Sequence, residues 1–334
     1  MTIDVVDGSG VTTDMQTAIN EVVGAYDTAF ANPITLTIGL QGASCGSCVA
    51  DSLTQTGSVA YGSAASSGSW YSAMSNYAAS GLSNPTFNTA FASLPTNQTA
   101  ASSALGGTNG NVTVTAANLT ALGYSVSLGT QNFATATGFD GVISVNSALS
   151  VGIPSHGTIP GGTYDLVSAL EHELDEVMGI GSALNAGHGY PNTPFAEDYF
   201  RYSAPGTRSW NPSSSIKAYF SIDGGTTDLA NFNQNPSGDY NDWATANGGC
   251  SGAGNPLPQD AFAASGQVPL LMCNSSTPDP ELMALDALGY DLANTAPLLA
   301  LDASQEAQTV PEPASIALLA PALLGLLRLR RRVV

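Results

Sequence analysis

Three residues near the middle of the chain have the side chains and the spacing of a metal site: His172, Glu173 and Glu176. They belong to residues 162–179, a segment with helical spacing between glycines. Residues four apart on a helix lie one turn apart on the same face, so His172 and Glu176 can bind one ion. Glu173 lies beside that face, where its carboxylate can accept a proton from a water molecule on the ion.

The helix that presents these residues has its own start, buried face and end. Thr163 is the predicted N-cap, Asp165 falls in the first turn and Gly179 ends the helix. The apolar side chains fall in one stripe, which we expect to be buried: Leu166, Leu170, Leu174 and Val177. Glu171 and Asp175 fall on a third side, which we expect to face solvent. An acidic helix that binds no metal shows the same pattern, so the pattern alone is a weak signal.

The pattern His-Glu-x-x-Glu is one residue away from the His-Glu-x-x-His helix of zinc peptidases. In that helix two imidazoles bind zinc and the intervening glutamate activates the bound water. Glu176 replaces the second imidazole with a carboxylate, which adds negative charge and weakens the preference for zinc over harder divalent ions.

Longer segments around this helix resemble a group of secreted bacterial metalloproteases of the zincin type, whose members often end in a PEP-CTERM tail. The resemblance covers residues 10–293, and the segments concerned are 171–182, 197–209, 218–225, 238–243 and 282–291. It implies an α+β, metzincin-like domain over residues 1–293, with a mixed sheet, an active-site helix and a smaller C-terminal lobe. The lobes divide near residue 182, giving about 1–182 and 183–293. The implied activity is zinc endopeptidase action on protein or peptide substrates, with Glu173 as general base.

A third metal ligand is needed, and the sequence offers several. Asp198 is favoured because it lies in a segment that resembles the family. His188 is chemically the better donor but lies in a Gly/Asn/Pro-rich loop outside that pattern, and Glu197 is a further alternative. Ser182 is a poor ligand because its hydroxyl is neutral.

Other elements follow from periodicity. Helices are predicted at 13–31, 71–79, 85–92, 116–122 and 279–288, and strands at 34–40 and 139–146. The resemblance implies that the second strand is the sheet edge along which substrate lies, through Val142, Ile143, Ser144 and Val145. It also implies that Met272 forms a turn beneath the metal. A core strand and a core methionine are the alternatives.

Four cysteines allow three interpretations: two disulfides, a redox pair, or half of a zinc-binding set. The context of a redox motif is missing around Cys45 and Cys48, and the chain has no second Cys-x-x-Cys pair. We therefore expect a Cys45–Cys48 disulfide and a Cys250–Cys273 disulfide, as is usual in exported proteins.

The formal net charge of −19 argues against binding to nucleic acid. Calcium is a second metal to consider, because aspartates lie in the turns of residues 218–243: Asp223, Asp228, Asp239 and Asp242. Their spacing fits no calcium loop, so ordinary turn chemistry is favoured. We expect a monomer.

The C-terminus combines Pro311-Glu312-Pro313, an apolar run over residues 316–327 and a cluster of four arginines: Arg328, Arg330, Arg331 and Arg332. Residues 310–334 resemble a PEP-CTERM sorting signal, which implies secretion by a Gram-negative bacterium. It also implies transient anchoring in the inner membrane by the apolar segment, which we expect to be a transmembrane helix, and cleavage by an exosortase. Residues 294–309 are predicted to be a linker. Residues 1–10 show no signal-peptide pattern.

Two functions from different classes follow. The first is a secreted endopeptidase with low turnover, because two carboxylate ligands make the metal less electrophilic. The second is a non-catalytic matrix or surface protein on the same scaffold, which suits the Ser/Gly/Asn-rich composition. A serine hydrolase is disfavoured because no Gly-x-Ser-x-Gly elbow precedes a helix.

Overall fold

The computed structural model of the chain describes residues 1–43, 54–58, 60–95, 111–154, 159–184, 194–244, 256–262, 264–272 and 279–306. These residues form a mixed α/β structure with seven α-helices and with both parallel and antiparallel strand pairs. The four cysteines, His188 and the sorting signal lie outside the described residues, so the predictions for them stay predictions. None of the described helices has the length and apolar character needed to cross a membrane.

The main sheet has four strands: β1 (Thr2–Asp7), β2 (Thr35–Ala43), β3 (Thr54–Ser58) and β6 (Gly141–Asn146). Their order is β1-β2-β6-β3, with β1, β2 and β6 parallel and β3 antiparallel to β6. The strand predicted at 139–146 is therefore present. Its predicted role as the substrate edge, through Val142 to Val145, is wrong, because both sides of β6 are already paired with neighbouring strands.

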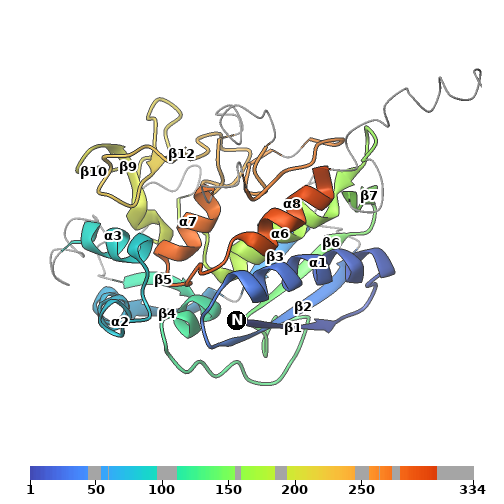
Figure 1. Cartoon of the computed structure of the whole chain (residues 1–334), viewed down its shortest axis with the longest axis horizontal. Coiled ribbons are helices and arrows are strands. Elements are labelled where there is room, and N and C mark those ends of the chain that lie inside the picture. Colours follow the sequence, from blue (N-terminus) through green and yellow to red (C-terminus); the bar gives the residue numbers. More distant parts are fainter. Residues whose placement is uncertain are drawn as a thin grey trace, which may run out of the picture.

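Helices α1 (Thr13–Ala29) and α6 (Leu166–Met178) lie over this sheet, side by side (Figure 1). The predicted N-terminal helix is confirmed, and its apolar positions are buried. The backbone of β6 approaches α6 closely at Gly141, where an added Cβ atom would collide with the side chain of Val177. The glycine therefore permits the helix to pack directly on the sheet.

A second group of elements packs beside the main sheet. It consists of β4 (Ala60–Ser66), α2 (Ser67–Ala79), α3 (Pro85–Ser93), β5 (Asn111–Thr115) and α5 (Ala116–Ala121). The three short helices predicted in this region are thus confirmed. A two-stranded pair, β7 (Val151–Gly152) with β8 (Tyr164–Asp165), leads into α6.

A small antiparallel sheet follows α6 in the chain. Its strands are β9 (Arg201–Ala204), β10 (Thr207–Arg208), β11 (Tyr219–Phe220) and β12 (Ala230–Asn231), preceded by a 3-10 helix, η2 (Glu197–Phe200). Aromatic rings fill its interior: the Trp243 ring lies 5.7 Å from that of Phe220 and 5.1 Å from that of Phe232.

The chain then forms α7 (Pro280–Ala287) and α8 (Ala296–Glu306). Asp279 caps α7 by accepting hydrogen bonds from the backbone N–H groups of Glu281 and Leu282. The prediction that residues 294–309 are a linker is wrong over the length of α8. Leu298 and Leu301 are buried, and α8 packs against α1, because apolar residues recur at helical spacing in this segment.

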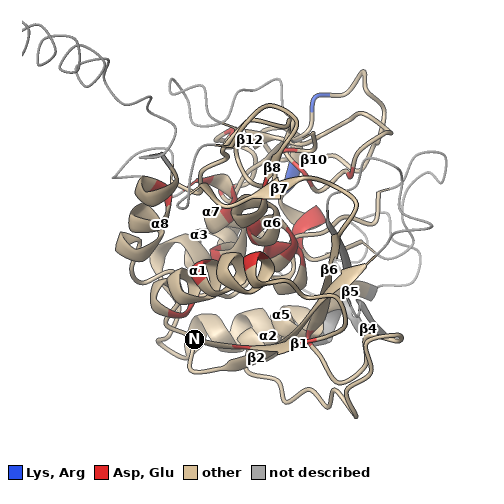
Figure 2. Cartoon of the chain, turned by 90° about the vertical axis from the view of Figure 1, so that its right-hand side faces the viewer, with Lys and Arg blue, Asp and Glu red and all other residues tan. Residues whose placement is uncertain are grey.

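The burial of α6 differs from the prediction. Its apolar stripe is buried as expected, but Glu171 and Asp175, predicted to face solvent, are both 0% exposed. Figure 2 shows acidic residues gathered on α6, α7 and α8. Burial raises the pKa of Glu171 well above its usual value, and nearby acids such as Asp302 raise it further. A helical wheel shows which residues share a face but not that neighbouring helices cover the opposite face as well.

Asp140, which joins the sheet just before β6, should make stability depend on pH. Its carboxylate accepts a hydrogen bond from the backbone N–H of Thr37, and burial raises its pKa to about 6. The protonated carboxyl is therefore favoured by folding: its contribution is complete below about pH 4 and is lost as the pH rises through about 6, a change of about 3 kcal/mol.

We expect Asp140→Asn, which keeps an acceptor for Thr37, to raise the free energy of unfolding at pH 8 and to leave it nearly unchanged at pH 4. Denaturant unfolding with chelator present at both pH values measures this. An equal pH dependence in the two proteins would show that Asp140 does not titrate in this range.

Candidate metal centre

The geometry of the candidate metal centre depends first on how α6 is positioned. Asp165 is its N-cap, in place of the predicted Thr163, and accepts hydrogen bonds from the N–H groups of Val167 and Ser168 at 2.9 and 3.4 Å. Gly179 ends the helix with a φ of 131°, a backbone conformation that favours glycine. With both ends and the apolar stripe fixed, His172 and Glu176 have a defined direction.

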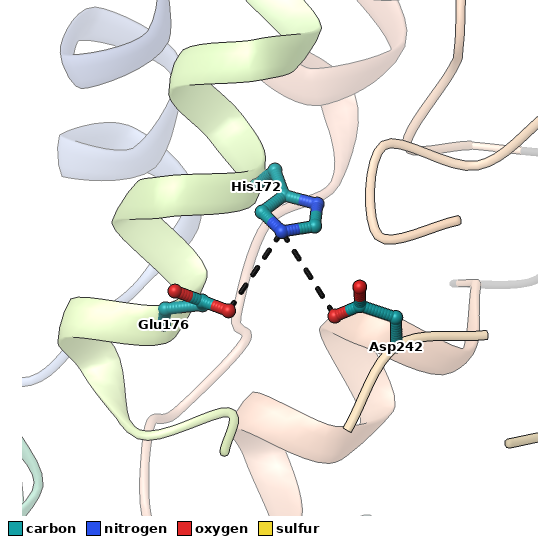
Figure 3. Close-up of side chains that lie close together, drawn as sticks. All are labelled: His172, Glu176 and Asp242. Carbon is teal, nitrogen blue, oxygen red and sulfur yellow. Dashed lines mark ion pairs between the residues drawn. The ribbon is translucent and has the colours of Figure 1, made fainter. Parts of the chain in front are cut away.

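His172 and Glu176 do point to one place, as predicted, and the third residue there is Asp242 (Figure 3). His172 Nε2 lies 3.7 Å from Glu176 Oε1 and 3.9 Å from Asp242 Oδ1. One donor atom from each residue lies within 4.8 Å of the other two, and no other described group of His, Cys, Asp and Glu meets this condition. The site is partly open, with side-chain exposures of 19% for His172, 21% for Glu176 and 4% for Asp242.

These separations suit a small divalent ion. Ligand atoms at about 2.1 Å from a tetrahedral ion lie about 3.4 Å apart, and the two carboxylate oxygens are within a few tenths of an ångström of that distance from His172 Nε2. The donors are one imidazole nitrogen and two carboxylate oxygens, which fit zinc and also harder ions such as manganese.

The ring of His172 is oriented from its far side. Nδ1 lies 3.0 Å from the carbonyl oxygen of Pro258. Because that oxygen can only accept, Nδ1 carries a proton, which leaves Nε2 as the ring nitrogen that can bind a metal ion. A hydrogen bond of this kind fixes the tautomer and the direction of a metal-binding histidine.

Two amide side chains orient the carboxylates. Asn241 Nδ2 donates to Glu176 Oε1 at 3.2 Å and to Asp242 Oδ1 at 2.8 Å. Gln259 Nε2 donates to the same Asp242 oxygen at 3.1 Å. Both carboxylates are thus held with one oxygen toward His172.

The electrostatics of the group attract positive charge. Burial lowers the pKa of His172, but the carboxylates of Asp242, Glu176 and Glu173 outweigh burial and raise it to about 9. Burial raises the pKa of Asp242 to about 7, against the lowering effect of His172. Glu173 is only 4% exposed and acts on both groups through its charge, which places it close to the site.

The structure does not bring Asp198, the predicted third ligand, into this group. Its Oδ2 accepts hydrogen bonds from the N–H groups of Ala183 and Phe195, and its Oδ1 accepts from Ser182 Oγ at 2.6 Å. Asp198 therefore organises the chain just after α6, where its oxygens have other partners, and Asp242 replaces it as the third carboxylate.

Glu197, the other acidic alternative, also lies outside the group. Its Oε2 accepts a hydrogen bond from the N–H of Gly181 at 2.8 Å. Burial raises its pKa well above the usual value.

The aspartates considered for calcium do not converge either. Asp223 accepts hydrogen bonds from Ser221 and Thr227 within its own turn, and Asp228 pairs with Lys217 at 2.7 Å. Turn hydrogen bonds thus account for Asp223 and an ion pair for Asp228, whereas Asp242 lies in the candidate metal centre. Met272 is a buried member of the main core, and its role beneath the metal stays a prediction.

The sequence around Asp242 gives only a weak local signal. It directly precedes Trp243, a large apolar residue in a turn-rich segment, and follows Asn241. A buried tryptophan brings the adjacent carboxylate to the edge of the core, where a free charge is costly. The sequence around Pro258 and Gln259 contains no feature that indicates a role in the site.

Comparisons with known proteins add no family to this description. No protein-family model matches the chain, and neither curated proteins nor solved structures give a match.

Substitution of Asp242 and of Asp198 tests directly which aspartate is the third ligand. We expect Asp242→Asn to weaken Zn²⁺ binding by more than about 100-fold, since loss of a ligand should cost more than loss of a partner that only orients one. Asp198→Asn should change the affinity by less than about threefold and instead lower the unfolding temperature, because a buried carboxylate that accepts several hydrogen bonds is lost. Calorimetric titration with Zn²⁺ measures the first effect and thermal unfolding the second. The reverse pattern would restore Asp198 as the ligand.

Proposed function

We propose that the chain is a metal-dependent endopeptidase whose metal is held by His172, Glu176 and Asp242. The observation that supports this most is the convergence of their three donor atoms beside Glu173, on the face of a His-Glu-x-x-Glu helix. Two of the three proposed ligands and a carboxylate suited to proton transfer thus belong to one short, well-anchored helix, and Asp242 comes from a separate segment.

The protein's own residues have distinct tasks in this proposal. A bound divalent ion would lower the pKa of a water molecule and polarise the scissile carbonyl group. Glu173 accepts the proton of the attacking water and delivers it to the leaving amine. Asn241 and Gln259 hold the ligand carboxylates, and Pro258 keeps His172 Nε2 directed at the site.

Zinc is the proposed ion, and turnover should be low. Two carboxylate ligands add negative charge to the site, which raises the pKa of the nucleophilic water relative to a site with three histidines.

The finer fold and the cellular location belong to the same proposal. A helix with paired ligands packed on a mixed sheet supports a zincin-like arrangement, as the sequence resemblance implies. Secretion and exosortase processing rest on the C-terminal motif at residues 310–334.

A non-catalytic surface protein with a structural ion is the competing function. The observation in its favour is that Gln259 places an amide next to two of the ligands, where a catalytic site needs room for water. Hydrolysis separates the two functions: a protein that binds the ion tightly and cleaves no peptide is a scaffold.

We expect Glu173→Gln to reduce peptide hydrolysis by about 10²–10⁴-fold and to retain the ion, because the amide cannot accept the proton. Hydrolysis of casein and of fluorogenic peptides by the purified chain, with and without chelator, measures this, together with metal content. Glu171→Gln is the matched control: it makes the same substitution two residues away, at a buried carboxylate outside the metal group. Equal activity in Glu173→Gln and the unaltered chain would exclude the mechanism.

A further inference from the structure

The side chain of Gln259 occupies a special place in the metal centre. It is 0% exposed, and its Nε2 atom lies 3.3 Å from His172 Nε2 and 3.1 Å from Asp242 Oδ1. These separations are close to the spacing of about 3.4 Å between two donors on one tetrahedral ion. Relative to His172 and Asp242, the end of the Gln259 amide therefore has the spacing of a further donor on the same ion.

The two ends of this amide have unequal surroundings. Nε2 contacts both ligands, whereas Oε1 is buried and has no hydrogen-bond partner among the described residues. The oxygen and nitrogen of an amide are nearly equal in size, so a half-turn of the amide exchanges them without changing the packing. The exchange sacrifices no hydrogen bond of Oε1, because Oε1 makes none.

Whether Nε2 or Oε1 of Gln259 is the more favourable atom to face the ligands depends on whether a cation is bound between them. Without an ion, the NH₂ group suits its carboxylate neighbour, since it donates to Asp242 Oδ1. With a divalent cation between the ligands, the NH₂ dipole points its positive end at the ion and is repelled. The amide oxygen is then favoured, because amide carbonyls are good ligands for hard cations.

From this geometry, and resting on the metal centre proposed above, we propose that Gln259 Oε1 is the fourth protein ligand of the ion. The amide turns over when the ion binds. The donor set is then one imidazole nitrogen and three oxygens, two of them charged. A water molecule for Glu173 must enter as a fifth ligand, and the oxygen-rich set widens the choice of metal toward manganese.

Two main-chain hydrogen bonds fix the position of Gln259 beside the site. Its N–H donates to Glu281 Oε1 at 2.6 Å, and its carbonyl oxygen accepts from the N–H of Trp243 at 2.9 Å. Both main-chain groups are therefore fixed on either side of the side chain. Asn241 also contacts two of the ligands, Glu176 Oε1 and Asp242 Oδ1. Gln259 is the stronger candidate because its buried Oε1 has no hydrogen-bond partner among the described residues and is free to bind an ion.

Titration of the full chain with Zn²⁺ and with Mn²⁺, followed by calorimetry, tests the proposal. We expect Gln259→Leu to weaken binding of both ions by about 10–100-fold. Gln259→Glu, which offers an oxygen in either orientation, should bind them at least as tightly as the unaltered chain. Gln305→Leu is the matched control, because Gln305 is equally buried, on α8 and outside the donor group, and should leave both affinities unchanged.

The visible spectrum of bound Co²⁺ gives a second readout. It should change in Gln259→Leu, where water replaces the amide oxygen, and not in Gln305→Leu. If Gln259→Leu does not fold in chelator, Gln259→Met takes its place in the titrations. It preserves the length of the side chain, and it should weaken Mn²⁺ binding because its thioether is a poor ligand for that ion.

Two results would overturn the fourth-ligand proposal alone: unchanged affinities in Gln259→Leu, or equal weakening in Gln259→Leu and Gln259→Glu. Equal weakening would mean that the amide serves as a hydrogen-bond donor. Failure of the unaltered chain to bind either ion is a different outcome, since it removes the proposed metal centre itself.

Discussion

The proposed metal centre depends on one pair of backbone hydrogen bonds between segments far apart in the sequence. The N–H of Trp243 donates to the carbonyl of Gln259, and the N–H of Ala261 donates back to the carbonyl of Trp243. This pairing sets Asp242 and Gln259 side by side and presents the Pro258 carbonyl to His172. Trp243 is itself held among the aromatic rings of the small sheet. The core of that sheet thus fixes the half of the site that α6 does not supply.

The half of the site that contains His172 and Glu176 depends on α6, a helix that is buried on nearly every side. Asp165 caps α6 from a buried position, and Glu171 and Asp175 lie within the core. Asp175 accepts a hydrogen bond from the Tyr26 hydroxyl at 2.9 Å, which joins α6 to α1. Neither oxygen of Glu171 has a hydrogen-bond partner among the described residues. Burial of these acids in charged form would be costly, and their raised pKa values express that cost.

The sequence predicts local features of this site better than its long-range ones. The positions of α6, of its apolar stripe and of the pair His172 and Glu176 follow from helical periodicity, which is a property of neighbouring residues. The inner position of β6 could not be predicted in this way, because its partner β3 belongs to a Ser/Gly-rich segment without strand alternation. Asp242 was missed for the same reason: its distance from α6 in space is set by the pairing of Trp243 with Gln259, and no local pattern encodes that pairing.

The shortage of cations near the site supports the proposal that it binds an ion from solution. The described part of the chain contains three Lys and Arg residues, and all have partners outside the site. Arg201 donates to the carbonyl oxygen of Tyr240 and lies over the Phe232 ring. Arg208 donates to the carbonyl oxygens of Tyr199 and Ser93, and Lys217 pairs with Asp228. Two carboxylates held together at the edge of the core repel one another unless positive charge lies between them. A proton on His172 supplies one charge, which compensates for one of the two acids. A divalent ion supplies two, and it can contact both carboxylates and the imidazole at once, which a single proton cannot do.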